Sequence, residues 1–116
     1  ITLDFAITRL TKVIKELRVY PENMKRNMRQ SKGLYNSQQL LLMLTQKGVS
    51  REDAYSAVQK IAMDVWNSKD LDFIKEAQKD DFVKSHISDN ELEEISKLEY
   101  HTKFVDTLFS RVFGIK

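Results

Sequence analysis

The clearest fold signal in the chain lies in residues 50–67, SREDAYSAVQKIAMDVWN. Ser50 can cap a helix, and Asp53 places an acid in the first turn, where the helix dipole favours negative charge. The apolar residues that follow recur every three or four positions, as on one face of a helix: Ala54, Tyr55, Val58, Ile61, Ala62, Val65 and Trp66. The pattern predicts a helix that runs from Ser50 to about Asn67.

Upstream of this stretch, an amphipathic helix is predicted over about residues 1–18. Its apolar residues alternate spacings of four and three, the a/d pattern of a left-handed helix pair: Leu3, Ile7, Leu10, Ile14 and Leu17, here called the heptad seam. Pro21 lacks a backbone N–H and pushes Tyr20 away from helical dihedrals, so this helix is expected to stop near Val19.

Two further helices are predicted between Pro21 and Gly48. Proline suits the first position of a helix, which indicates a short helix from Pro21 to about Gln30, and Gly33 is a natural left-handed stop after it. Asn36 or Ser37 can cap the next helix, with Gln39 in reach of a capping box. The apolar run 40–44 inside that helix predicts central burial.

The last third of the chain predicts three more helices. Asp70 is the expected cap of a fifth helix that turns Leu71, Ile74 and Ala77 inward, and Phe82 and Val83 are interpreted as a tucked connector. Ser88 with Glu91 forms a capping box for a sixth helix. The sixth helix would carry Leu92, Ile95 and Leu98, and the last would hold Phe104, Val105, Leu108, Phe109, Val112 and Phe113 on one apolar face.

The sequence therefore predicts an all-α fold, a single compact helical domain of about seven helices. Three Gly and one Pro in 116 residues leave few of the turns that an all-β fold needs. No apolar run approaches the roughly 20 residues of a membrane span, and the absence of cysteine fits a reducing compartment, so we expect a cytoplasmic protein that contacts no membrane. Because the helical pattern already runs at Ile1 without a cap, we expect the chain to be part of a longer one.

Charge is distributed unevenly along the chain. Residues 1–32 hold eight Lys and Arg against three Asp and Glu, a net charge of +5, whereas residues 70–99 hold four against ten, a net charge of −6. Lys25, Arg26, Arg29 and Lys32 form the best candidate for an anion-steering surface, since positions 25, 29 and 32 share a helical face. Binding of nucleic acid is not expected, because neither interleaved aromatic residues nor a helix-turn-helix accompany the cluster.

Other residues of potential chemical interest are interpreted as structural. His86 and His101 have no second ligand at metal-binding spacing, and Met24, Met28 and Met43 are expected to fill the core. Neighbouring acids, Asp80 with Asp81 and Glu93 with Glu94, point about 100° apart on a helix and so do not share a proton. No catalytic group, metal site or cofactor is expected in this chain.

Several blocks of sequence closely resemble the C-terminal domain of the adenylosuccinate lyase family. They cover the chain in order: VYPENMKRNM at 19–28, KGL at 32–34, SQ at 37–38, LLL at 40–42, KGVSREDAY at 47–55, VQ at 58–59, AM at 62–63, Trp66 and FVDTLFSRV at 104–112. Family members commonly have Arg where Gln39 stands, and Asp-Pro before the final helix where this chain has residues 97–100, KLEY.

The resemblance implies a carbon–nitrogen lyase of the fumarase/aspartase superfamily, usually a homotetramer built around long helices. Such enzymes eliminate fumarate from adenylosuccinate and from the succinyl-carboxamide ribotide of purine biosynthesis, using a histidine and a serine on a mobile loop. Those residues belong to segments that precede Ile1 in the family, so no active-site residue is carried over to this chain. Residues 1–18 would be the end of a long central-domain helix, and 19–116 the C-terminal domain, inactive alone.

Two other functions remain open from the residues alone. A freestanding helical interaction domain could bind a partner helix along the heptad seam. A small nucleic-acid binder could use the face around Arg26 and Arg29. On either the lyase or the interaction-domain hypothesis, an exposed heptad seam is expected to make the isolated chain associate.

Overall fold

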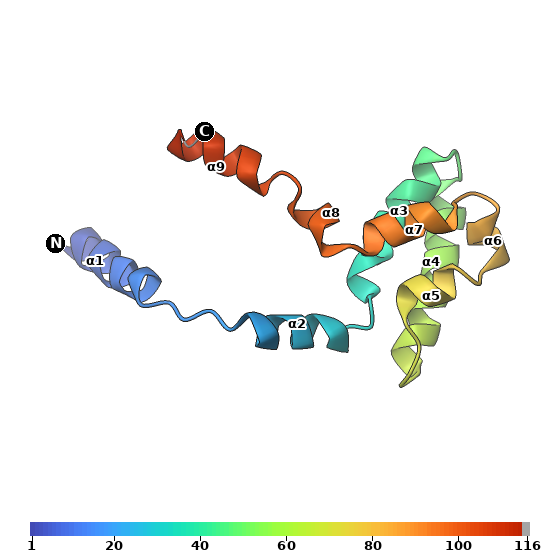
Figure 1. Cartoon of the computed structure of the whole chain (residues 1–116), viewed down its shortest axis with the longest axis horizontal. Helices are drawn as coiled ribbons and strands as arrows, with labels where there is room; N and C mark the ends of the chain where they lie inside the picture. Colours follow the sequence, from blue (N-terminus) through green and yellow to red (C-terminus); the bar gives the residue numbers. More distant parts are fainter. Residues whose placement is uncertain (115–116) are drawn as a thin grey trace.

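Helices form most of the computed structural model, which describes residues 1–114 (Figure 1). No strand occurs in that range, so the all-α prediction is confirmed. The elements are α1 (Thr2–Lys15), α2 (Pro21–Gln30), the 3₁₀ turn η1 (Leu34–Asn36), α3 (Ser37–Gln46), α4 (Arg51–Asn67), α5 (Phe73–Ala77), α6 (Asp81–Lys84), α7 (Asp89–Ser96), α8 (Leu98–Thr102) and α9 (Val105–Phe113).

The hydrophobic core lies where α3 and α4 pack against each other, with α5 and α7 across them (Figure 1). Its buried members come from α3 to α7 and the turn before α7: Leu40, Leu44, Ala54, Val58, Ile61, Val65, Phe73, Ile74, Ala77, Val83, Ile87, Leu92 and Ile95. We call residues 31–102, which enclose this core, the central unit. In α4 the buried side chains form a narrower stripe than the sequence suggests, since Tyr55 and Trp66 are exposed.

Local signals at the ends of the helices are largely confirmed. The Ser50 hydroxyl accepts a hydrogen bond from the Asp53 N–H at 3.1 Å, and Ser88 and Glu91 form the predicted capping box. Gly33 takes the left-handed conformation, with φ of 77°. These signals depend on a few adjacent residues, which is why the sequence alone contains them.

Several predicted details differ from the structure. The cap of α5 is Asp72, whose carboxylate accepts from the N–H groups of Ile74 and Lys75, and not Asp70. The expected connector around Phe82 and Val83 contains the short helix α6, capped by Asp80. Because Lys97 is extended, with φ of −71° and ψ of 136°, α7 ends there. Leu98 therefore begins a separate helix, α8, and is exposed, and the described range has more helices than the predicted seven.

The start of α3 also differs from the prediction. Asn36 is its N-cap residue by position, but neither its side chain nor a capping box involving Gln39 satisfies the first N–H groups. The amide oxygen of Asn36 instead accepts from Nε2 of His101 at 3.1 Å, and Asn36 is the buried polar residue of the core. In α3, Leu40 and Leu44 are fully buried as predicted, whereas Leu42 is exposed.

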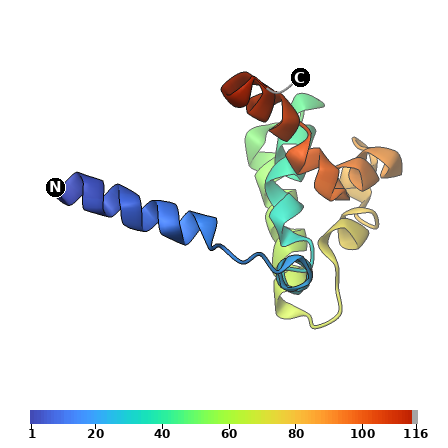
Figure 2. The same ribbon diagram turned by 60° about the vertical axis from the view of Figure 1, so that its left-hand side comes forward.

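Three helices outside the central unit, α1, α2 and α9, contain no buried residue. Figure 2 shows α1 standing away from the rest of the chain. The radius of gyration is 19.4 Å, against about 13 Å for a compact domain of this length. Met24, predicted in the core, is 59% exposed on α2, and Met28 and Met43 are only half-buried. No helix among residues 1–114 is long and apolar enough to cross a membrane.

Candidate functional site

The predicted anion-steering residues Lys25, Arg26 and Arg29 lie together on one exposed face of α2. Pro21 fixes the first turn of this helix, and Lys25 forms an ion pair with Glu22 at 3.1 Å. Arg26 and Arg29 form no ion pair within the described part of the chain. Their charges are therefore directed to solvent, where they can attract an anion.

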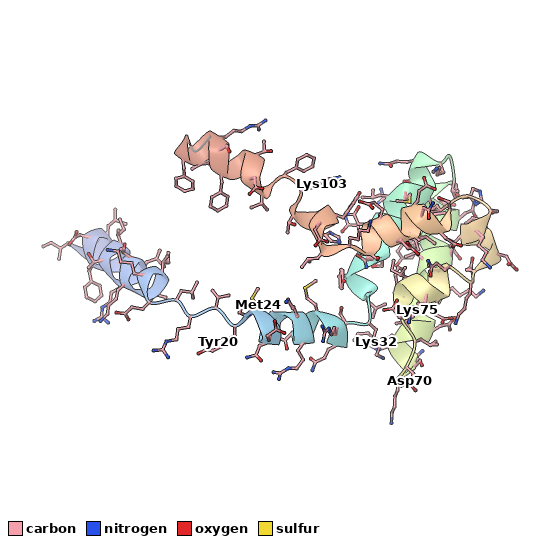
Figure 3. All side chains as sticks on the ribbon, in the orientation of Figure 1. Tyr20, Met24, Lys32, Asp70, Lys75 and Lys103 are labelled. Atoms are coloured by element: carbon pink, nitrogen blue, oxygen red, sulfur yellow. The ribbon has the colours of Figure 1, made fainter. Side chains whose placement is uncertain are left out.

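Lys32, the fourth basic residue of the cluster, has a different place. It lies beyond the end of α2 in a left-handed conformation with φ of 51°. Its ammonium group donates to the carbonyl oxygen of Val65 at 3.2 Å and to that of Ser68. Lys32 thus satisfies carbonyl groups at the end of α4, where a cation is favoured, and does not share the face of Lys25 and Arg29. Figure 3 shows Lys32 beyond the end of α2.

A hollow of about 540 Å³ lies beside α2, and Arg29 forms part of its wall. Lys75 of α5, labelled in Figure 3, also lines it. The sequence alone does not predict this, because residues 29 and 75 line one hollow only in the folded chain. Asp72 and Glu93 line it as well, so two cationic and two acidic residues contribute to its wall. The hollow is locally balanced in charge and adds little to the attraction of an anion by α2.

Several carboxylates of the acidic segment, residues 70–99, cap helices or form ion pairs. Glu91 forms an ion pair with Lys47 at 2.7 Å and accepts from the Ser88 N–H at 3.0 Å. These hydrogen bonds lower the pKa of Glu91 from 4.5 to about 2. The side-chain hydrogen bond from Lys47 is the largest cause, and the hydrogen bonds from Ser88 come next. Similarly, the hydrogen bond to Glu94 raises the pKa of Lys97.

The two histidines make contacts of a structural kind. The His86 Nδ1 lies 2.9 Å from the Phe82 carbonyl oxygen and 2.9 Å from the Ser85 hydroxyl. His101 bonds to Asn36 and packs edge-on against the rings of Tyr35 and Tyr100. No cluster of three His, Asp or Glu suited to a metal ion occurs among the residues that the structure describes.

A second hollow, with a volume of about 740 Å³, lies between α3 and α4. Most of its lining side chains are apolar, and the one charged residue among them is Arg51. Such a groove suits an apolar side-chain surface better than a charged small molecule. We call it the α3–α4 groove.

The chain is similar in sequence to one known family and to several known enzymes. The family described as "Adenylosuccinate lyase C-terminus" matches residues 33–112. An adenylosuccinate lyase of Helicobacter pylori (strain ATCC 700392 / 26695) is 41% identical over 97% of this chain and 28% of its own length. Enzymes of the same name are 39% identical in Streptococcus mutans, over 97% of this chain and 26% of their own length, and 39% identical in Thermotoga maritima, over 95% and 25%. The chain spans about a quarter of the length of these relatives.

Proposed function

The chain belongs to the adenylosuccinate lyase family, and from this premise we propose that it forms the C-terminal helical domain of an enzyme that eliminates fumarate from adenylosuccinate, leaving AMP. The same enzyme would act on the succinyl-carboxamide ribotide of purine biosynthesis. The observation that carries the proposal is the identity of about 40% along nearly the whole chain. This favours the lyase over a freestanding interaction domain.

Within that enzyme, the chain would have a structural role. The catalytic histidine and the serine loop of the family belong to parts that precede the matched segment, so the elimination would take place on residues outside this chain. The domain would support the subunit and help close one side of the active-site cleft in a cytoplasmic homotetramer.

An assay of fumarate release, read by absorbance, tests this role. The complete lyase is expected to turn over adenylosuccinate, and the 116-residue chain alone is expected to have no measurable activity. Equal activity of the chain alone would contradict the proposal. So would a complete protein that folds and assembles but does not act on adenylosuccinate.

The division of the chain follows from the same proposal. Residues 1–18 would be the end of a long central-domain helix, and 19–116 the C-terminal domain. Two features support this: the heptad seam is exposed along all of α1, with Leu10 58% exposed, and α1 has no buried residue. In the homotetramer, neighbouring long helices would cover the seam, because its a/d spacing suits packing against other helices.

The basic face of α2 would attract the polyanionic substrate to the complete enzyme. Lys25, Arg26 and Arg29 are exposed and lie within residues 1–32, which carry a net charge of +5. Electrostatic steering of this kind raises association rates and weakens with salt, since the Debye length is only about 10 Å at 0.1 M.

Charge reversal in the complete enzyme tests the steering role. We expect the double variant Lys25→Glu/Arg29→Glu to lower kcat/KM by about threefold to tenfold at low salt, with the difference shrinking at high salt. Lys84→Glu makes the same kind of charge change on the exposed surface of α6 and is the matched control. Unchanged kcat/KM of the double variant at low salt would remove the steering role without affecting the assignment as a lyase domain.

A further inference from the structure

The α3–α4 groove presents apolar surface that the central unit leaves uncovered. Leu42 and Tyr55 line it and are 42% and 56% exposed, while Leu41 and Ala62 form part of its floor. Polar side chains line the rest: Ser37, Gln38, Thr45, Arg51 and Gln59. An apolar floor between polar edges is the anatomy of a site that receives a helix.

Exposed large side chains continue this surface along α4 beyond the groove. Trp66, four residues after Ala62 and therefore on the same face, is 71% exposed. Met63, the next residue after Ala62, is also exposed. Tryptophan and tyrosine dominate the energetic centres of protein interfaces, so Tyr55 and Trp66 together favour a protein partner over a small molecule.

The chain itself contains a helix that matches the groove, namely α9. Its apolar stripe follows spacings of three and four and is exposed throughout: Val105, Leu108, Phe109, Val112 and Phe113. The nine residues of α9 span about 13 Å, and the ten of α3 about 15 Å. Length and apolar pattern therefore agree over the whole groove.

Charge indicates the direction in which α9 would lie. Asp106 is in the first turn of α9, and Arg51, at the start of α4, lines the end of the groove beside Val49. Arg51 forms no ion pair within residues 1–114. Placing Asp106 next to Arg51 makes α9 antiparallel to α3 and brings Phe113 toward Ala62 and Trp66.

If α9 lies antiparallel to α3 in the groove, the α9 in the groove cannot be that of the same chain. His101 is held to Asn36 at 3.1 Å, and the Tyr100 hydroxyl donates to the Gln39 side chain at 3.5 Å. Both contacts fix the start of α9 near the beginning of α3, at the end of the groove opposite to Arg51. An α9 that folded back on its own groove would bring Arg111, not Asp106, toward Arg51. Figure 1 shows α9 leading away from α8.

We propose that the α3–α4 groove receives α9 of a second copy of the chain, and that two copies exchange their α9 helices about a twofold axis. A twofold axis makes the contact reciprocal, so that one pairing fills both grooves.

The other unpartnered helix, α1, fits the groove less well. Its fourteen residues span about 21 Å, and its heptad seam has the spacing that pairs with another long helix. Lys12 and Lys15, near its end, would add positive charge at a groove whose charged residue is Arg51.

Disulfide trapping tests the exchange, because the chain has no cysteine of its own. Two single-cysteine variants, Gln59→Cys on the groove and Leu108→Cys on α9, are mixed, one of them carrying a mass tag, and oxidised. We expect a disulfide between the two different copies. The matched control for Gln59→Cys is Asp64→Cys, which is exposed on α4 and lines a different hollow. Trp66→Ala in the Gln59→Cys partner is expected to slow trapping about tenfold.

Each other outcome overturns the proposal. Equal trapping at positions 59 and 64 would mean random collision. A disulfide that forms only within single chains carrying both Gln59→Cys and Leu108→Cys would place α9 in its own groove. Predominant pairing of Leu108→Cys with itself would mean that the α9 helices meet each other. Absence of any trapping, with far-UV circular dichroism unchanged by the substitutions, would show that α9 of a second copy does not bind in the groove.

Discussion

The central unit and α1 are both built from amphipathic helices, but only the central unit buries its apolar side chains. In α4, Val58, Ile61 and Val65 are buried against neighbouring helices. In α1 and just beyond its end at Leu17, all residues of the heptad seam are exposed for more than half of their surface. An apolar periodicity therefore predicts that a helix forms and which face needs cover, but not which chain supplies the cover.

The α9 helix repeats this lesson at the other end of the described chain. Its stripe is as regular as that of α4, and it lies outside the core. The two exposed helices differ in pattern, because the heptad seam suits long parallel or antiparallel helices while the shorter α9 stripe matches the α3–α4 groove. We therefore propose different occupants for the two surfaces.

The sharpest test of this contrast removes one large side chain from each region. Phe73→Ala in the core is expected to lower the free energy of unfolding by about 3–5 kcal/mol, since Phe73 is fully buried and a cavity remains. Leu10→Ala on α1 is expected to change the free energy of unfolding of the monomeric chain by less than about 0.5 kcal/mol, as for other exposed sites. Urea unfolding at a concentration low enough to keep the chain monomeric measures both.

Similar losses in the two variants would break the contrast. They would mean that α1 packs on the central unit in solution. Light scattering then decides whether Leu10→Ala acts through association, in which case its effect grows with protein concentration.

A smaller difference is expected between two left-handed glycines. A Cβ at Gly33, where φ is 77°, would lie 3.3 Å from an Asp72 carboxylate oxygen, whereas a Cβ at Gly114, where φ is 63°, meets nothing within 4 Å. Gly33→Ala is expected to lower the free energy of unfolding by about 2 kcal/mol, from the backbone conformation and the crowding together. Gly114 follows the last residue of α9, outside the core. For Gly114→Ala we therefore expect the free energy of unfolding to change by less than about 0.5 kcal/mol in the same measurement.

Lysines provide a third comparison. Lys32→Met removes the two hydrogen bonds to the carbonyl groups of Val65 and Ser68 while keeping the length of the side chain. Charge-assisted bonds at a partly exposed helix end indicate a loss of about 1 kcal/mol. Lys25→Met breaks only the exposed ion pair with Glu22 and is expected to cost less than about 0.5 kcal/mol. Thermal melts followed by circular dichroism would show whether the two losses differ.

The parts of the fold that sequence predicted correctly depend on neighbouring residues. The α4 helix, the Ser88 capping box and the left-handed Gly33 each arise from a few adjacent positions. The choice of Asp72 over Asp70 as a cap does not, because the Phe73 N–H also donates to the carbonyl oxygen of Lys32 at 2.9 Å. That contact joins residues 32 and 73, which are far apart in the sequence, and it fixes where α5 begins.

The candidate site shows the same division. Helical spacing was enough to place Lys25, Arg26 and Arg29 on one face of α2. It wrongly added Lys32, because the helix ends at Gln30 and the Lys32 side chain turns to the end of α4. The α3–α4 groove could not be predicted either, since the depth between two packed helices depends on side chains from both.

The smallest effect we predict is a change with pH that begins at Glu91. Its carboxylate forms an ion pair at 2.7 Å with Lys47, at the end of α3, and so joins α7 to α3. The hydrogen bonds from Lys47 and Ser88 lower the pKa of Glu91 from the ordinary 4.5 to about 2. The folded chain therefore keeps Glu91 ionised at pH values where the unfolded chain has already bound a proton. This stabilises the fold fully above about pH 5, and the stabilisation is lost progressively as the pH falls through 4.5 toward 2.

Glu91→Gln removes this linkage and leaves the other carboxylates in place. We expect the variant to be less stable than the natural chain at pH 7 and to approach it as the pH falls to about 2.5, in urea midpoints measured at four or five pH values. Lys47→Met should flatten the acid side of the profile in the same way, because Lys47 is the largest cause of the lowered pKa. Glu16→Gln is the matched control, because Glu16 is the C-cap residue of α1 and its contact with Lys12 at 4.0 Å joins two exposed side chains. A Glu16→Gln profile that flattens as much as that of Glu91→Gln would show that acid acts on the net charge of the whole chain and not on the contact between α3 and α7.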